Sequence, residues 1–134
     1  EHYEKGLLND EIARVITNKG YHKEIITADS AEQKSIEEIR KSGIRRIKPA
    51  RKGKDSVLNG IQYLNQYNII VHPKCVNTLQ ELENYCWDKD KQTNEYVNKP
   101  VDNFNHILDA LRYAVEELSR GWKLKSISKS AFGL

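Results

Sequence analysis

The sequence has few cysteines and no long apolar run, and both absences restrict what the protein can be. Its longest apolar stretches, such as 69–71, are only a few residues long, whereas about 20 are needed to cross a bilayer. We therefore expect no transmembrane helix. The first residues have neither a basic nor an apolar segment and do not begin with methionine. They do not resemble a signal peptide, and we expect a piece of a longer protein.

The cysteines and histidines do not form a recognisable metal or disulfide framework. Cys75 and Cys86 lie eleven residues apart on a predicted helix, or about 16 Å along its axis, which is too far for a disulfide. Reduced thiols predict a cytoplasmic setting. Neither CxxC nor HxxxH spacing occurs among the cysteines and four histidines, so structural zinc is not favoured. The segment 52–56 lacks the GxxxxGK[ST] frame, which excludes a Walker-type ATPase site.

What the sequence does contain is typical of one globular domain. Its 134 residues are 38% apolar and 31% charged, which favours a single core. The net charge is only +3, but positive charge is concentrated between positions 40 and 54, where no acidic residue interrupts it. The basic residues of this segment are Arg40, Lys41, Arg45, Arg46, Lys48, Arg51, Lys52 and Lys54. Such a segment is typical of a phosphate-binding stripe, although a solvated surface fits the same pattern.

Apolar spacing predicts alternating strands and helices. Helices are expected at 10–19, 31–41, 56–67, 75–86 and 103–120, and strands at 24–29, 44–48 and 68–72. A polar hairpin is expected at 87–97. This order predicts an α/β fold whose consecutive strands run parallel. We expect one domain over 1–120 and a mobile or partner-dependent tail over 121–134.

Two acidic positions and one histidine could carry chemistry. Asp29 ends the predicted strand 24–29, and open α/β sheets place ligands at the carboxyl ends of their strands. Asp29 could instead only cap the next helix, although Ser30 supplies a cap itself. His106 and Asp109 lie three residues apart and so share one face of the last helix, a spacing that also fits a surface pair.

The segment 102–114 carries the clearest likeness to a known family. It reads Asp-Asn-Phe-Asn-His-Ile-Leu-Asp-Ala-Leu-Arg-Tyr-Ala and resembles the closing HxxDALRYA helix of tailed-phage terminase large subunits of the PBSX type. Residues 26–32 resemble the family's central catalytic strand. Residues 85–87 with 90–91 resemble its penultimate helix and hairpin, and residues 3–12 its third strand and first helix. The likeness covers nearly the whole chain.

The resemblance implies a ribonuclease H-like nuclease fold, a mixed sheet flanked by helices. In that fold metal-binding aspartates come from the first strand, the central strand and the last helix. Asp29 is then the second and Asp109 the third, while His106 stands beside the metals and assists ligation or proton transfer. The first strand and its aspartate would precede Glu1, so we expect the N-terminal strands to be missing from this sequence and the fragment alone to be impaired.

The resemblance also implies a function. We expect a two-metal endodeoxyribonuclease that uses Mg²⁺ or Mn²⁺ to cut concatemeric double-stranded viral DNA. It would act in the bacterial host cytoplasm, together with the terminase small subunit and the portal protein, without a membrane. Backbone phosphates would be bound by Arg45, Arg46, Lys48, Arg51, Lys52 and Lys54.

Two alternatives remain open at the level of sequence. The chain could be a DNA-binding or assembly module without catalysis. It could also be another ribonuclease H-like nuclease, such as a resolvase or transposase, which shares acidic ligands but not the closing helix motif.

Overall fold

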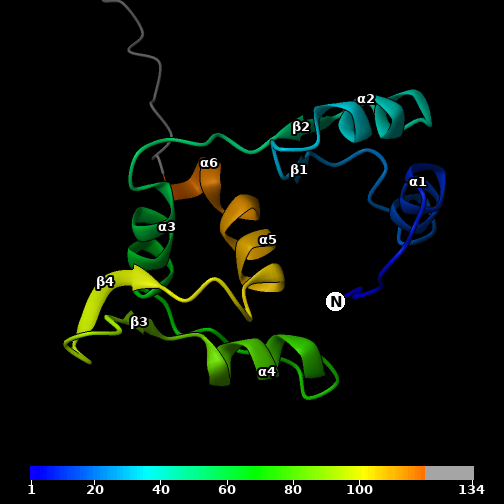
Figure 1. The fold of residues 1–134 in the computed structure, drawn as a ribbon. Coiled ribbons are helices and arrows are strands. Elements are labelled where there is room, and N and C mark those ends of the chain that lie inside the picture. The colour runs from blue at the N-terminus through cyan, green and yellow to red at the C-terminus, as the bar shows by residue number, and fades with distance from the viewer. Residues whose placement is uncertain (120–134) are drawn as a thin grey trace, which may run out of the picture.

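A computed structural model describes residues 1–119, except for the side chain of Asn98. The tail predicted at 121–134 lies outside this range. The helices are α1 (Asn9–Asn18), α2 (Gln33–Lys41), α3 (Ser56–Leu64), α4 (Val76–Asn84), α5 (His106–Ala114) and α6 (Glu116–Ser119). The strands are β1 (Ile26–Ala28), β2 (Ile47–Pro49), β3 (Trp87–Lys89) and β4 (Tyr96–Pro100). Figure 1 shows their arrangement.

The first half of the chain folds around a parallel pair of strands. β1 and β2 pair with Ile26 opposite Ile47, and α2 connects them. α1 packs on α2, and the core between these elements consists of Ala13, Ile36, Ile39, Ile44 and Ile47. The parallel pairing predicted for the first two strands is therefore confirmed.

Gly43 makes the tight end of α2 that this core requires. Its φ is +108°, a left-handed value that glycine adopts without the steric cost of a Cβ atom. The Gly43 backbone N–H donates to the Arg40 carbonyl at 3.1 Å, and that of Ile44 to the Ile39 carbonyl at 3.3 Å. The chain then reverses, and the Ile44 side chain becomes fully buried.

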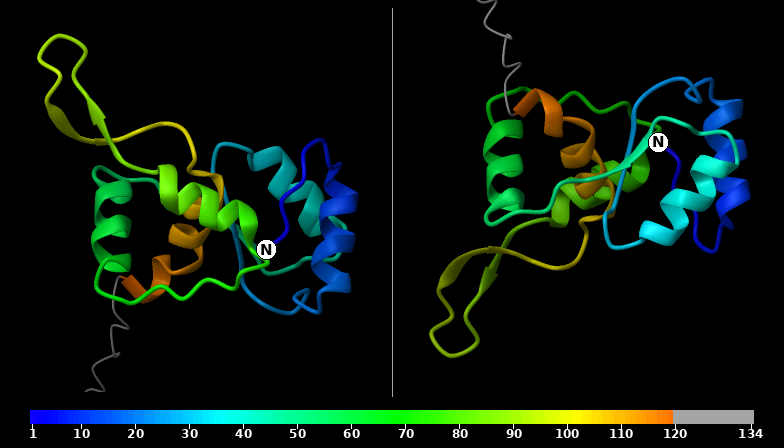
Figure 2. Two further views of the ribbon diagram at one scale, coloured as in Figure 1. Left: turned by 90° about the horizontal axis from the view of Figure 1, so that it is seen from below. Right: turned by 90° about the horizontal axis from the view of Figure 1, so that it is seen from above.

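The second half of the chain surrounds α5. This helix contacts β1, α3 and α4, so it joins the two halves of the molecule (Figure 1). In the two views of Figure 2, α5 lies between α3 on one side and the unit formed by α1 and α2 on the other. β3 and β4 form the predicted hairpin, which projects from the body and pairs antiparallel.

The strand predicted at 68–72 is wrong. These residues form no helix or strand, and Ile70 is 94% exposed. An apolar, β-branched run becomes a strand only where a neighbouring strand takes its backbone hydrogen bonds and a core takes its side chains. Within residues 1–119, the paired strands are β1 with β2 and β3 with β4, so this segment has no neighbour to join.

The predicted helix starts also differ in detail. α1 begins one residue earlier than expected, with Leu8 as its N-cap, and the Leu8 backbone N–H donates to the Glu11 carboxylate at 2.8 Å. Asparagine often caps a helix, but the Asn9 side chain donates to the Glu38 carboxylate of α2 at 2.6 Å. Ser30 does not cap α2 either, because the N-cap residue of α2 is Glu32.

The last helix is shorter than predicted. α5 ends at Ala114 and is followed by the separate short helix α6. Among residues 1–119, no helix has both the length and the apolar character that crossing a bilayer requires.

Candidate active site

Asp29 and Asp109 line the same cleft, which has a volume of about 750 Å³. Asp29 follows directly after β1, and Asp109 lies on α5, which packs against that strand. Burial, followed by the negative charges of both aspartates, raises the pKa of Tyr113. A single tyrosine therefore lies within the field of two carboxylates that are far apart in the sequence. We call this hollow the aspartate cleft.

The Asp29 carboxylate is held by its own loop and by a lysine. Its Oδ1 accepts the Ala31 backbone N–H at 2.9 Å and lies 3.0 Å from the Lys52 ammonium nitrogen. These two contacts, the backbone hydrogen bond first, hold the pKa of Asp29 below its usual range. Asp29 thus makes a local turn but does not cap α2, whose N-cap is Glu32, and its carboxylate lines the cleft.

The Asp109 carboxylate is held by a buried arginine one turn later. Arg112 donates to Asp109 through a short ion pair, and its side chain is only 9% exposed. Arg112 lies over Gly60 of α3, where a Cβ atom would come within 2.9 Å of the Arg112 Cδ. The absence of a side chain at Gly60 is therefore what lets the guanidinium reach Asp109.

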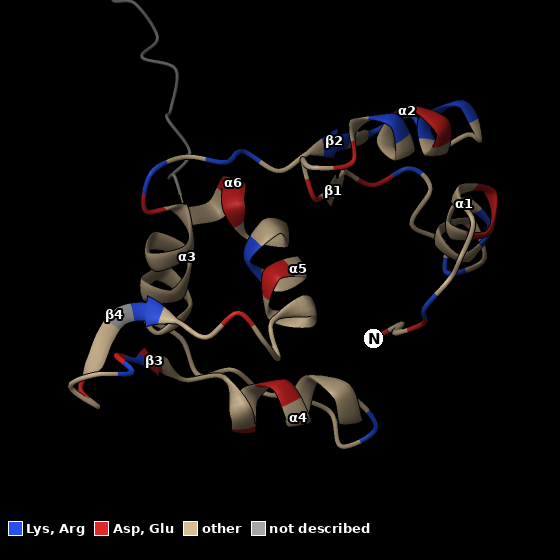
Figure 3. Ribbon diagram, viewed as in Figure 1, with Lys and Arg blue, Asp and Glu red and all other residues tan. Residues whose placement is uncertain are grey.

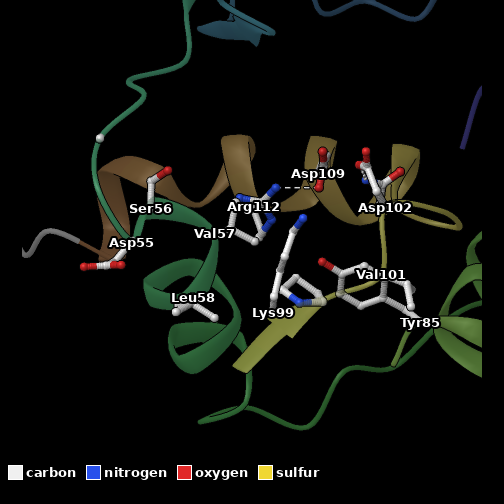
Figure 4. Close-up of a pocket in the computed structure, with 13 residues that line it drawn as sticks. Asp55, Ser56, Val57, Leu58, Tyr85, Lys99, Val101, Asp102, Asp109 and Arg112 are labelled. Atoms are coloured by element: carbon white, nitrogen blue, oxygen red, sulfur yellow. Dashed lines mark hydrogen bonds and ion pairs between the residues drawn. The ribbon is translucent and has the colours of Figure 1, made fainter. Parts of the chain in front are cut away.

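Asp109 and Arg112 also line a second hollow, of about 380 Å³, on the side of the hairpin. Figure 4 shows Lys99 and Tyr85 rising from the hairpin side toward these two residues. The Asp109–Arg112 pair thus borders two spaces, one of them shared with Asp29.

His106 is placed apart from the two aspartates. It is the first residue of α5 and is exposed. Its ring centroid lies 6.4 Å from that of Tyr3, and it is not among the residues that line the aspartate cleft. Although His106 and Asp109 lie one turn apart, only Asp109 faces the cleft in this structure.

The six residues of the basic stripe that were predicted to bind phosphates divide into two groups. Arg51, Lys52 and Lys54 line the aspartate cleft. The remaining three, Arg45, Arg46 and Lys48, lie just before β2 or on it. Figure 3 shows this positive charge running from α2 through the loop that leads to α3.

Several members of the stripe contact other protein groups. The Arg46 guanidinium donates to the Lys23 carbonyl at 3.0 Å. Lys48 forms a short ion pair with Glu117, and the Arg51 guanidinium lies 3.8 Å from the same carboxylate. Part of the positive charge is thus balanced within the chain. Within residues 1–119, no hydrogen bond or ion pair of this kind is found for Lys54, which lines the cleft.

The donor set of the cleft fits a hard divalent cation in kind. Carboxylate oxygens are the ligands that Mg²⁺ prefers, and the Lys52 ammonium already places a positive charge 3.0 Å from Asp29. Within residues 1–119, however, no three His, Cys, Asp or Glu side chains gather closely enough to hold a metal ion by themselves. Among the described residues, the carboxylates that line the cleft are those of Asp29, Asp109 and Glu116.

Comparison with known proteins identifies the family of the chain. The family described as "Terminase RNAseH like domain" matches residues 1–117. The chain belongs to the terminase RNase H-like family. The resemblance read from the closing helix is confirmed, and this result favours a terminase over the resolvase or transposase alternative.

Relatives of this terminase domain are terminase large subunits. The chain is 36% identical over 107 residues to "Terminase, large subunit" of Bacillus phage SPP1, covering 78% of this chain and 25% of the relative. It is 31% identical over 122 residues to the PBSX phage terminase large subunit of Bacillus subtilis (strain 168), covering 87% and 27%. The chain spans about a quarter of the length of these relatives.

A solved structure with the same fold supports the assignment. The crystal structure of the large terminase nuclease domain from bacteriophage SPP1 with bound Mn superposes with a TM-score of 0.78 at 32% identity. The match covers 85% of this chain and 66% of that chain. The predicted ribonuclease H-like fold is therefore confirmed.

Sequence reasoning missed Lys52 and Arg112 as partners of the two aspartates of the terminase domain. Arg112 was detectable, because a residue three positions after Asp109 lies on the same side of a helix. The glycine at position 60 inside a predicted helix was a second signal, since such glycines often permit a close approach. The pairing of Lys52 with Asp29 left no local trace, because the two residues come from different loops.

Proposed function

We propose that this chain is the nuclease domain of a terminase large subunit, which hydrolyses phosphodiester bonds of viral DNA during packaging. The observation that carries the proposal is the meeting of Asp29 and Asp109 at one cleft. The bound Mn of the SPP1 nuclease domain supports a divalent metal at such a site. The whole protein would act on concatemeric double-stranded DNA in the host cytoplasm.

Asp29 and Asp109 would hold Mg²⁺ or Mn²⁺, two ions in the complete site. When bound, the ions supply a polarised water as nucleophile and stabilise the charge on the leaving oxygen. The Ala31 backbone N–H orients Asp29, and Arg112 orients Asp109. The Ala31 contact also favours the ionised form of Asp29, which metal binding requires.

Asp29 and Asp109 alone do not complete the proposed metal site. The family resemblance implies a third metal-binding aspartate from the first strand, and no group of three metal-ligating side chains occurs among residues 1–119. His106 would assist only if the first turn of α5 turned it from Tyr3 toward the cleft. The proposal therefore assigns full activity to the complete protein.

The basic residues would bind DNA through its phosphates. Arg51, Lys52 and Lys54 line the cleft itself, while Arg45, Arg46 and Lys48 would extend the contact along β2. Such contacts give affinity without reading sequence and weaken as salt rises. In the packaging assembly, the terminase small subunit and the portal protein would be the protein partners.

Metal-dependent plasmid cleavage by the full-length protein tests this function. Asp29→Asn and Asp109→Asn should each lower Mn²⁺-dependent cleavage by more than about 100-fold, since loss of even an indirect metal contact costs about 10–100-fold. Asp10→Asn, on the outer helix α1, is a matched control that should cut normally. Cleavage at the normal rate by both cleft variants would refute the assignment.

A second candidate is a DNA-binding or assembly module without catalysis. It is favoured by one observation: each cleft aspartate is already paired with a basic side chain, Asp29 with Lys52 and Asp109 with Arg112. Salt-sensitive DNA binding by the full-length protein, with no cleavage in Mn²⁺, would establish this candidate instead.

A further inference from the structure

The two ion pairs at the aspartate cleft differ in how firmly they are held. The Arg112 side chain is 9% exposed and lies against Gly60, whereas the Lys52 side chain is 57% exposed. An exposed ion pair contributes little and exchanges readily with solvent and ions. A buried one resists separation, because each partner would be left uncompensated. Lys52 is therefore the cation of the cleft that can leave.

The Lys52 ammonium lies beside the Asp29 carboxylate, where a bound metal ion would place its own positive charge. It contacts Asp29 Oδ1 at 3.0 Å. Lys52 lines the aspartate cleft together with Asp29 and Asp109. One ammonium group thus shares a cleft with both carboxylates that the proposed nuclease would use.

The surroundings of Lys52 allow it to move. It lies in the segment 50–55, which connects β2 to α3 without helix or strand. Gly53 follows it, and no atom lies within 4 Å of the place where a Cβ of Gly53 would stand. A long side chain on such a loop can turn from Asp29 to another anion in the same cleft without disturbing the core.

We propose that Lys52 is an exchangeable counterion of Asp29: it neutralises this carboxylate before metal binds, and it moves to a DNA phosphate when a divalent ion takes its place. The inference rests on the proposed function, since it assumes a metal at Asp29 and DNA in the cleft. It predicts that metal and DNA each favour the binding of the other. A metal bound at Asp29 releases Lys52 for a DNA phosphate, and a DNA phosphate that binds Lys52 frees Asp29 for metal. Thermodynamic linkage makes this coupling reciprocal.

Mn²⁺ binding in the absence of DNA tests the exchange directly. The measurement is a titration of the full-length protein followed by the electron paramagnetic resonance of free Mn²⁺, counting only the binding that Asp29→Asn removes. Lys52→Gln should tighten this binding about two- to fivefold, the range expected when an exposed ion pair no longer competes. Lys54→Gln removes the same charge from the same cleft but no ion pair, and it should leave the affinity unchanged.

DNA binding without metal tests the other half of the exchange. In EDTA, the logarithm of DNA affinity is followed against the logarithm of salt concentration. Lys54→Gln should reduce the slope by about 1, as expected for one lost phosphate contact. Lys52→Gln should reduce it clearly less, because Lys52 is engaged with Asp29 in the metal-free protein.

The outcomes separate this inference from the proposed function. If Asp29→Asn and Asp109→Asn leave Mn²⁺ binding intact, the metal site itself is wrong and the inference falls with it. If those variants lose Mn²⁺ binding but Lys52→Gln does not raise the Mn²⁺ affinity above that of the Lys54→Gln control, only the exchange is overturned. An equal loss of salt slope in the two lysine variants would overturn it as well.

Discussion

The Glu81 carboxylate of α4 lies 2.8 Å from the backbone nitrogen of Ile107, in the first turn of α5. The same oxygen accepts the N–H of Leu108 at 3.1 Å, and Glu81 is only 4% exposed. The N-cap residue Asn105 makes no side-chain capping hydrogen bond. A distant acid therefore satisfies the free N–H groups at this helix start, where its charge is also favoured by the helix dipole. This contact fixes the helix that carries Asp109.

Removal of the Glu81 carboxylate should destabilise the protein. Glu81→Ala leaves two backbone N–H groups near the core without their acceptor, so we expect a loss of about 2 kcal/mol in the free energy of unfolding. Glu83→Ala, at an exposed position of the same helix, should change stability by less than about 0.5 kcal/mol. Urea unfolding of both variants measures the difference. Equal stability of the two would show that Glu81 does not hold α5.

Gly60 and Arg112 should show strong coupling in a double-mutant cycle. In an exposed helix interior, Gly→Ala stabilises by up to about 1 kcal/mol. Here the added Cβ would lie 2.9 Å from the Arg112 side chain, so Gly60→Ala should destabilise the otherwise normal protein. In an Arg112→Ala background the same change should become stabilising. Unfolding of all four proteins in denaturant gives the coupling, and additive effects would contradict the predicted contact.

Asp29 should titrate at lower pH than a free aspartate. The Ala31 hydrogen bond and the Lys52 ion pair lower its pKa below 3.8. Lys52→Gln should raise this pKa but leave it below that of a free aspartate, because the Ala31 hydrogen bond is the larger cause. Carboxyl-carbon NMR over pH 2–6 measures both values. An unchanged midpoint in Lys52→Gln would contradict the ion pair.

The lowered pKa of Asp29 also fixes the sign of its effect on stability. A carboxyl whose pKa is lower in the folded protein favours folding when it is ionised. Its contribution is therefore present at neutral pH and is lost as the pH falls through the lowered pKa. Asp29→Asn should be less stable than the parent at pH 7, and this difference should disappear once the pH falls below the lowered pKa of Asp29. A difference that grows as the pH falls would contradict this assignment.

Burial, not hydrophobicity alone, should decide which isoleucine matters. Ile44 is 0% exposed and belongs to the core formed by the first half of the chain, whereas Ile70 is 94% exposed. Ile44→Ala should cost about 2–5 kcal/mol, because it removes buried atoms and leaves a cavity. Ile70→Ala should cost less than about 0.5 kcal/mol. Thermal and urea unfolding of the two variants provide the test, and a large loss in Ile70→Ala would show that this segment packs against protein.

The local features of the fold were readable from the sequence. Gly43 ends α2, and the polar hairpin forms near its predicted position, because these depend on backbone preferences of neighbouring residues. The closing motif around Asp109 was also sufficient to identify the family. In each case the deciding interactions lie within a few residues along the chain.

The sequence misled where a local preference had to compete with the rest of the molecule. The β-branched run that includes Ile70 has the composition of a strand but no neighbouring strand among residues 1–119. Asn9 is a good capping residue, yet its amide is taken by Glu38 on another helix. Such outcomes depend on which elements pack side by side, and local propensity carries no information about that.

By itself, the sequence determined that a helix carries Asp109, that a strand ends at Asp29, and that basic residues are concentrated in the segment 40–54 between them. Only the tertiary structure decided that these parts face one cleft, with Lys52 on one aspartate and buried Arg112 on the other. The physical reason is the packing of α5 on β1 and α3, aided by the bare Gly60 and by the distant cap from Glu81. Contacts between residues so far apart in the chain arise only when the whole core assembles.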